Sequence, residues 1–268
     1  MIALELWDLL VNGRVLWETM QEPEFPETLC RTIAALRRGQ GETRSEGRVP
    51  GVIAGFDSLY VAGGRSREPQ IRSGLEILGL PIAFSQTPDF PGEIGGHRLL
   101  AGFASATGWL CDLGQTSFKI CTKGARMQFR RDLQRLPVRA DGPGESVPEQ
   151  RRQLRNWLSE SLGTFLYQAA EPDAILFAMP SRLDDEAVPE GSSYIGMAGD
   201  GSLIADAIMA AGMTPRRKLV MNDAELAALD AVAEAALQRC AKTLVITLGF
   251  GLGAALAIRT PTKGSRHA

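Results

Sequence analysis

The sequence has few of the residues that bind transition metals or cross-link chains. It contains only two histidines and four cysteines in 268 residues, and no two cysteines form a Cys-x-x-Cys pair. A structural zinc site usually needs four thiolate or imidazole ligands in one place, so we do not expect such a site. The wide spacing predicts reduced, mostly buried thiols at Cys30, Cys111, Cys121 and Cys240.

The sequence also lacks an excess of positive charge and any long apolar run. Twenty-nine basic against thirty-one acidic residues give a formal net charge of -2, which argues against a general nucleic-acid or membrane-surface binder. No run approaches the roughly 18 to 20 apolar residues of a membrane helix. Glu5 and Asp8 interrupt the first apolar stretch, which makes it a poor signal peptide. We expect a cytoplasmic protein that binds neither nucleic acid nor membrane.

Short apolar runs alternate with longer helical patterns, which is typical of an α/β architecture. Strands are expected at 58–62, 81–85, 109–113, 117–122, 174–179, 218–221, 243–248 and 254–258, and helices at 26–38, 70–78, 148–168, 203–211 and 224–241. Loops are expected at 38–50 and 140–147 and a frayed tail at 260–268, because these segments are polar or rich in glycine.

Residues 108–127 read as three strands joined by tight turns, followed by the helix at 148–168. In a Rossmann βαβ unit a helix would follow the first strand at once. An early G-x-G-x-x-G is also missing, which counts against a Rossmann oxidoreductase.

The segment D-L-G-Q-T-S at 112–117 lies between the first two of these strands. Turn N–H groups and a Thr or Ser hydroxyl can hold phosphate oxygens, and Gly114 lets the backbone come close to them. Asp112 is placed to hold Mg²⁺ through water. An ordinary β-turn also favours Asp and Gly, so both interpretations stay open for the isolated segment.

Two further glycine-rich turns follow apolar strands. Residues 249–253, G-F-G-L-G, separate two β runs and form either a phosphate-binding turn or a plain hairpin. Residues 59–65, L-Y-V-A-G-G-R, end a strand in a double glycine, which suits the close passage of a flat ligand or another backbone.

Asn222 and Asp223 lie between a strand and a helix. An aspartate at the carboxyl end of a strand can take a proton from a hydroxyl group in a cleft. Asn222 and Glu225 have the spacing of a capping box, and a cap formed by Asn222 is compatible with catalysis by Asp223.

Together these segments resemble the actin-like ATPase superfamily, which includes sugar kinases and heat-shock chaperones, and most closely the ROK family of bacterial sugar kinases. D-L-G-Q-T-S resembles the first phosphate motif, M-N-D-A-E-L-A-A-L the family's asparagine-aspartate motif, T-L-G-F-G-L-G-A-A-L-A-I the second phosphate motif and L-Y-V-A-G-G-R-S the adenosine motif. In the family the adenosine motif follows the second phosphate motif, whereas here it precedes all the others. A circular permutation accounts for this order, and domain termini that lie close together permit it.

The resemblance implies an α/β, two-domain actin-like ATPase (ribonuclease H-like) fold that is circularly permuted. Residues 1–106 would be the adenosine-motif part of the nucleotide-binding domain, with helices over 1–51. Residues 107–222 would be the first phosphate and substrate domain, and 223–268 the rest of the nucleotide-binding domain with the second phosphate motif.

The implied activity is an ATP- and Mg²⁺-dependent kinase acting on a hydroxyl of a sugar or sugar-like small molecule. Asp223 would be the general base, Asn222 would bind the substrate, and Asp112 would help to position Mg²⁺. The loop 182–194 would carry specificity. The phosphates would be contacted by Gly114, Gln115, Thr116, Ser117, Gly249, Gly251 and Gly253, and the adenosine by Gly63 and Gly64.

Other functions stay open beside the kinase. The chain could be a catalytically inactive ATP-binding sensor or scaffold of the same fold, which would bind ATP without turning it over. A ROK-type repressor is disfavoured because the leading segment has no clear helix-turn-helix and the net charge is negative. The acceptor is not identified by the sequence, and a homodimer is left open.

Overall fold

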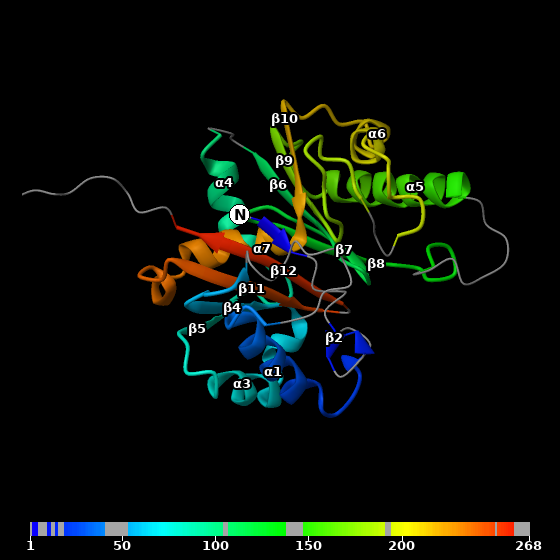
Figure 1. Ribbon diagram of the computed structural model, residues 1–268. Helices are drawn as coiled ribbons and strands as arrows, with labels where there is room; N and C mark the ends of the chain where they lie inside the picture. Colours follow the sequence, from blue (N-terminus) through cyan, green and yellow to red (C-terminus); the bar gives the residue numbers. More distant parts are fainter. Residues whose placement is uncertain are drawn as a thin grey trace, which may run out of the picture. The chain divides into compact units, whose positions relative to one another are not determined.

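Contacts divide the chain into two units (Figure 1). One unit consists of residues 92–226, and the other of residues 1–91 together with 227–268. The computed structural model describes residues 2–4, 10–11, 14–15, 19–40, 53–103, 107–137, 147–190, 194–249 and 251–259. Most of the two predicted loops, at 38–50 and 140–147, and the whole of the tail 260–268 lie outside the described residues.

The unit formed by residues 92–226 has a mixed five-stranded sheet in the order β10-β9-β6-β7-β8. β6 runs parallel to β9, and β9 parallel to β10, whereas β7 and β8 follow β6 as antiparallel neighbours. The strands are β6 (Gly108–Leu113), β7 (Ser117–Cys121), β8 (Arg126–Arg130), β9 (Ala174–Met179) and β10 (Arg217–Asn222).

Helices cover both faces of this sheet. α5 (Val147–Leu166) packs beside α6 (Leu203–Ala210), and both contribute to one buried core with β6 and β7. α4 (Glu93–Ala101) packs on β6, and Figure 1 shows it on the side of the sheet opposite α5. The buried stripe of α5 confirms the predicted helix face, with Leu154, Leu158, Leu162 and Phe165 in the core and Trp157 and Leu166 packed against it.

Strand alternation decides which residues face which helix. Trp109 and Cys111 of β6 lie in the core with α5, whereas Leu110 faces α4, where its side chain lies 3.0 Å from a Cβ built at Gly96. Asp112 therefore shares the α4 side of the sheet with Leu110. Phe118 of β7 lies in the α5 core, so its neighbour Lys119 points to the same side as Asp112.

The other unit also contains a mixed five-stranded sheet, in the order β1-β12-β11-β4-β5. β11 runs parallel to β4, and β4 to β5, whereas β12 and β1 are antiparallel neighbours on the other side. The strands are β1 (Ile2–Leu4), β4 (Ser58–Ala62), β5 (Ile82–Phe84), β11 (Lys242–Leu248) and β12 (Leu252–Ile258). A second core, separate from the first, joins this sheet to α1 (Phe25–Arg37) and α3 (Pro69–Glu76).

The two sheets have the same plan. Each has a hairpin, β6–β7 or β11–β12, whose second strand pairs with a further antiparallel strand, β8 or β1. The first strand of each hairpin pairs on its other side with two parallel strands in succession. The difference is chain order, because the five strands of residues 92–226 occur consecutively, whereas in the other unit the hairpin comes last.

The α/β class and the predicted strands are confirmed, with boundaries that agree to within two residues. The prediction of helices alone over residues 1–51 is wrong, because short strands precede α1: β1, β2 (Leu10–Val11) and β3 (Arg14–Val15). The predicted helix 224–241 is too long. α7 (Asp223–Ala233) ends where Glu234 turns to extended backbone, and the short 3-10 helix η3 (Ala235–Leu237) follows.

All four cysteines are free, and three of them are buried, as predicted. Among the described residues, no helix has both the length and the apolar character that crossing a membrane requires.

Candidate functional site

The predicted first phosphate motif forms the turn between β6 and β7. The Gly114 N–H donates to the Ser117 carbonyl at 2.9 Å and closes the turn. Thr116 is exposed at its tip, whereas Ser117 is buried and its hydroxyl accepts a hydrogen bond from Gln128 Nε2 at 3.0 Å. The turn therefore presents its backbone and one hydroxyl group.

The other carbonyl groups of this turn, those of Gly114, Gln115 and Thr116, also accept hydrogen bonds. The Tyr194 hydroxyl donates to the Gly114 carbonyl at 2.7 Å, and Arg131 Nη1 donates to the Gln115 carbonyl at 3.0 Å. The Arg131 N–H donates to the Thr116 carbonyl at 2.9 Å. The N–H groups of Gln115 and Thr116 form no hydrogen bond with any residue that the structure describes. Turn N–H groups of this kind can donate hydrogen bonds to an anion.

Arg131 is the main support of the turn. It is buried, and its guanidinium carbon lies 3.6 Å from the centroid of the Tyr194 ring. It also donates to the carbonyl groups of Leu136 and Pro137. Burial lowers the pKa of Arg131 and raises the pKa of Tyr194. Arginine stays charged in proteins, so a positively charged side chain holds the turn carbonyl of Gln115.

Asp112 lies on β6 just before the turn and is paired with a lysine. It is 5% exposed, and Lys119 Nζ lies 2.9 Å from its Oδ2. The hairpin register places the two residues directly opposite each other. The carboxylate predicted to position Mg²⁺ is thus already partly neutralised.

Asn222 and Asp223 occupy the junction of β10 and α7. Asn222 caps the helix, because its Oδ1 accepts from the Ala224 N–H at 2.8 Å and its N–H donates to Glu225 Oε2 at 3.4 Å. The predicted capping box is confirmed. Asn222 Nδ2 also donates to the Ser181 carbonyl at 2.8 Å, which ties the end of β10 to the segment after β9.

Asp223 has an unusually high pKa. Burial raises its pKa, and the charge of Asp112 raises it further, while a hydrogen bond from the Ala224 N–H and the charge of Lys119 act in the opposite direction. The result is a pKa of about 7. Perturbed carboxyl groups of this kind occur at functional sites, and such a group can both accept and release a proton near neutral pH.

These residues gather at one edge of their sheet. β6, β9 and β10 are parallel, and Asp112 is in register with Ala178 and Ala178 with Met221. Asp112, the 114–117 turn, Asn222 and Asp223 therefore all lie at the carboxyl ends of these strands. That edge is where open α/β sheets bind ligands.

The predicted adenosine motif lies beside the second phosphate motif in the other unit. Gly63 ends β4 with φ 88°, and a Cβ there would lie 2.4 Å from the Leu248 carbonyl oxygen at the end of β11. Only glycine fits this approach. Gly64 is exposed and has open space around it.

The segment predicted to be the second phosphate motif connects β11 to β12. The Gly249 N–H donates to the Gly251 carbonyl at 3.1 Å, and Gly253 pairs with Thr247 within the hairpin. Phe250 lies outside the described residues. The glycines at 63, 64, 249, 251 and 253 thus share the carboxyl edge of β4 and β11.

The structure adds Lys119, Arg131 and Tyr194 to the residues predicted from sequence. Lys119 could have been found from the hairpin register, because a turn at 114–117 places it opposite Asp112. Tyr194 ends the loop 182–194 that was expected to carry specificity, and only its contact with Gly114 reveals its role. Nothing in the sequence around Arg131 indicates that it contacts the turn, apart from its position directly after β8.

The residues around the predicted first phosphate motif include the donors that a phosphorylated ligand would need. Two backbone N–H groups and the Thr116 hydroxyl are available for phosphate oxygens. Asp112 offers a carboxylate group, although its Oδ2 forms an ion pair with Lys119. This set fits Mg²⁺ held through water and phosphate better than an ion bound directly by several carboxylates.

No protein-family model matches this sequence, and a search of curated proteins finds no similar protein. The assignment of a function therefore depends on the motifs and on the geometry of these residues.

Proposed function

We propose that the chain is an ATP-dependent kinase that phosphorylates a hydroxyl group of a sugar or sugar-like small molecule. The observation that carries this proposal is Asp223, whose pKa is raised to about 7 at the edge where the first phosphate motif also lies. A carboxylate with this pKa is partly ionised at neutral pH and can take the proton of an attacking hydroxyl group.

The roles follow from the contacts. The Gln115 and Thr116 N–H groups would bind phosphate oxygens, and Asp112 would orient Mg²⁺ through water. Mg²⁺ would neutralise charge that develops on the phosphates during transfer. Lys119 would compensate the charge of Asp112, and Asn222 would fix the start of α7, so that Asp223 stays in one position. Positioning and charge neutralisation account for most of the catalysis in this kind of reaction.

The strand orders support an actin-like fold with circular permutation. Two sheets of the same plan are expected if two similar domains make up the molecule. In residues 92–226 the hairpin precedes the parallel strands, and in the other unit it follows them. If the hairpin β11–β12 were moved in front of β1, β4 and β5, the strands of both units would follow one another in the same order. A circular permutation produces this relation.

The test is acceptor-dependent release of ADP from Mg-ATP, measured with a panel of sugars, amino sugars and polyols. We expect turnover with at least one acceptor and its loss in Asp223→Asn, with ATP binding by calorimetry unchanged. Loss of a general base lowers rates about 10²- to 10⁴-fold. Glu160→Gln is the matched control, because it makes the same change on the exposed face of α5.

ATP binding without turnover by the wild type would favour the inactive sensor or scaffold over the kinase. Turnover that survives in Asp223→Asn would remove Asp223 as the base, and failure to bind ATP would refute the superfamily assignment.

A further inference from the structure

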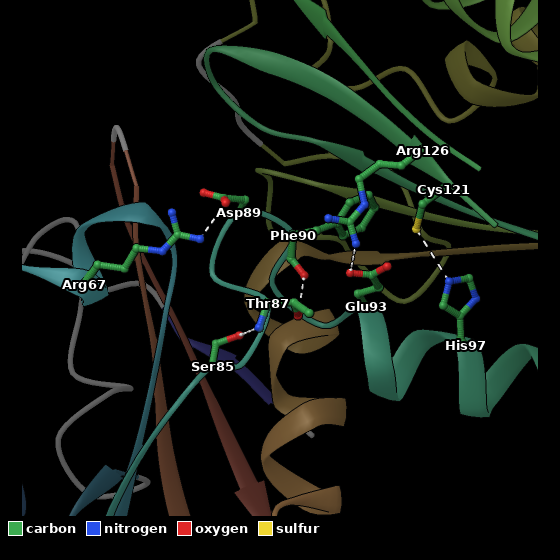
Figure 2. Close-up of polar contacts among 9 residues, drawn as sticks. All are labelled: Arg67, Ser85, Thr87, Asp89, Phe90, Glu93, His97, Cys121 and Arg126. Carbon is green, nitrogen blue, oxygen red and sulfur yellow. Dashed lines mark hydrogen bonds and ion pairs between the residues drawn. The ribbon is translucent and has the colours of Figure 1, made fainter. Parts of the chain in front are cut away.

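Three metal-binding side chains meet away from the phosphate motif. Glu93 and His97 lie one turn apart on α4, and Cys121 is the last residue of β7. One ligand atom from each lies within 4.8 Å of the other two. Figure 2 shows His97 and Glu93 projecting from α4 toward the Cys121 sulfur.

The fold places these residues on one side of the sheet. Residues four apart on a helix share a face, so Glu93 and His97 point the same way. Cys121 alternates with Ile120, which lies in the α5 core, and therefore faces α4. The sequence separates Cys121 from His97 by 24 positions, and only the packing of α4 on the sheet joins them.

The spacing of two ligand atoms already matches a zinc site. His97 Nε2 and Cys121 Sγ are 3.6 Å apart. A thiolate sulfur about 2.3 Å and an imidazole nitrogen about 2.0 Å from a tetrahedral zinc ion lie about 3.5 Å apart. Glu93 offers a third ligand atom, which lies within 4.8 Å of the other two.

The cluster lies at the boundary between the core and solvent. Cys121 is fully buried, and His97 is partly buried. The Glu93 side chain is 14% exposed, so the cluster is open to ions from solution.

Two positively charged side chains, Lys123 and Arg126, oppose a cation here. Arg126 forms an ion pair with Glu93 through Oε2. In the view of Figure 2 it approaches Glu93 from one side, and His97 and Cys121 lie on the other. The second carboxylate oxygen is not used in that ion pair, and carboxylates that bind metals commonly accept an outer hydrogen bond as well.

We propose that Glu93, His97 and Cys121 bind a zinc ion, with water in the fourth position, and that the ion fixes α4 to the end of β7. On binding, Zn²⁺ takes the place of the Cys121 thiol proton, which is released to solvent, and a zinc–sulfur bond forms without any change of oxidation state. The mixture of sulfur, nitrogen and oxygen ligands suits zinc and not magnesium. This inference does not rest on the proposed kinase activity.

The test uses the full chain, freed of metal with a chelator and titrated with Zn²⁺ against a chromophoric chelator. We expect one zinc ion per chain and a melting temperature that rises with zinc. Substitution by Co²⁺ should give a thiolate-to-cobalt charge-transfer band and the absorption of a tetrahedral ion. Cys121→Ser should abolish the band, and His97→Gln should raise the Kd at least about tenfold.

Matched controls come from the same chain. Cys30→Ser and His267→Gln make the same changes elsewhere and should leave zinc binding unaltered. If a variant of a buried ligand fails to fold, Glu93→Gln changes a partly exposed ligand and should still weaken zinc binding, and the wild-type cobalt spectrum needs no variant. Absence of the charge-transfer band, or equal zinc binding by Cys121→Ser, would overturn the site. The 3.6 Å contact would then be a thiol–imidazole hydrogen bond.

Discussion

Burial and the nearby carboxylate of Asp112 act in the same direction on Asp223. Both disfavour its ionised form, and together they raise its pKa from the ordinary value of 3.8 to about 7. The Lys119 ammonium group, paired with Asp112 at 2.9 Å, limits this effect. The protonation of Asp223 at the start of α7 thus depends on two residues from neighbouring strands, Asp112 on β6 and Lys119 on β7.

The raised pKa predicts a pH-dependent stability. Between pH 3.8 and about 7 the folded protein keeps a proton on Asp223 that the unfolded chain has lost. Stability contributed by that proton is therefore lost as the pH rises through this window. Asp223→Asn cannot ionise, so its stability relative to the wild type should increase by about 2 to 4 kcal/mol from pH 4 to pH 8.

Urea denaturation at a series of pH values checks this prediction. The difference between Asp223→Asn and the wild type should rise up to about pH 7 and then level off. Glu160→Gln, which replaces a carboxylate on an exposed helix face, is the control for the substitution itself. A constant difference across the series would mean that Asp223 titrates as it does in the unfolded chain.

Among the structural elements, the β6–β7 hairpin depends most on distant support. Its turn carbonyls accept hydrogen bonds from Arg131 and Tyr194, which come from segments after β8 and before α6. Arg131 packs on the Tyr194 ring, so each residue holds the other in place. The turn sequence by itself would permit several conformations, and these contacts select one.

Arg131→Lys should therefore loosen the hairpin. Lysine cannot reproduce the planar guanidinium that stacks on Tyr194 and reaches several carbonyl groups at once. We expect a loss of about 1.5 to 3 kcal/mol in the free energy of unfolding, the range for hydrogen bonds made by charged groups. Denaturant titration gives the free energy, and hydrogen exchange should show faster exchange at 113–118.

Arg130→Lys is the matched control for this change. It is the neighbouring residue on β8 and is exposed, so its replacement should alter stability by less than about 0.5 kcal/mol. Equal effects of the two substitutions would show that the Arg131 contacts do not hold the turn.

At the scale of the whole molecule, each unit has its own core. A substitution that destabilises one unit should thus affect the strands of that unit first. Gly63 is a suitable position, because it has φ 88° and a Cβ there would lie 2.4 Å from the Leu248 carbonyl oxygen. Gly64, its neighbour, has no atom within 4 Å of a Cβ.

Gly63→Ala should destabilise its own unit by about 2 to 5 kcal/mol, through backbone strain and overpacking. Hydrogen exchange should increase in β4, β11 and β12 and stay unchanged in β6, β9 and β10. Gly64→Ala should leave both sets of strands unchanged. Equal acceleration in both sets under Gly63→Ala would mean that the two units unfold together.

The sequence by itself determined much of the architecture, because its evidence is local. Strands such as 58–62 and 174–179, the buried stripe of α5 and the cap at Asn222 each depend on residues a few positions apart. Periodicity and capping preferences act within that range. The α/β class follows from the alternation of these elements.

Tertiary structure alone decided how distant side chains meet. Lys119 neutralises Asp112 because of the hairpin register, Tyr194 reaches Gly114 across 80 positions, and α4 brings His97 to Cys121. The expectation of no structural zinc site came from the small number of histidines and the absence of a Cys-x-x-Cys pair. Such counts cannot show that the packing of α4 on the sheet brings Glu93, His97 and Cys121 together. Burial is the largest cause of the raised pKa of Asp223, and burial is a property of the packed chain, because the surrounding residues remove water from the charge.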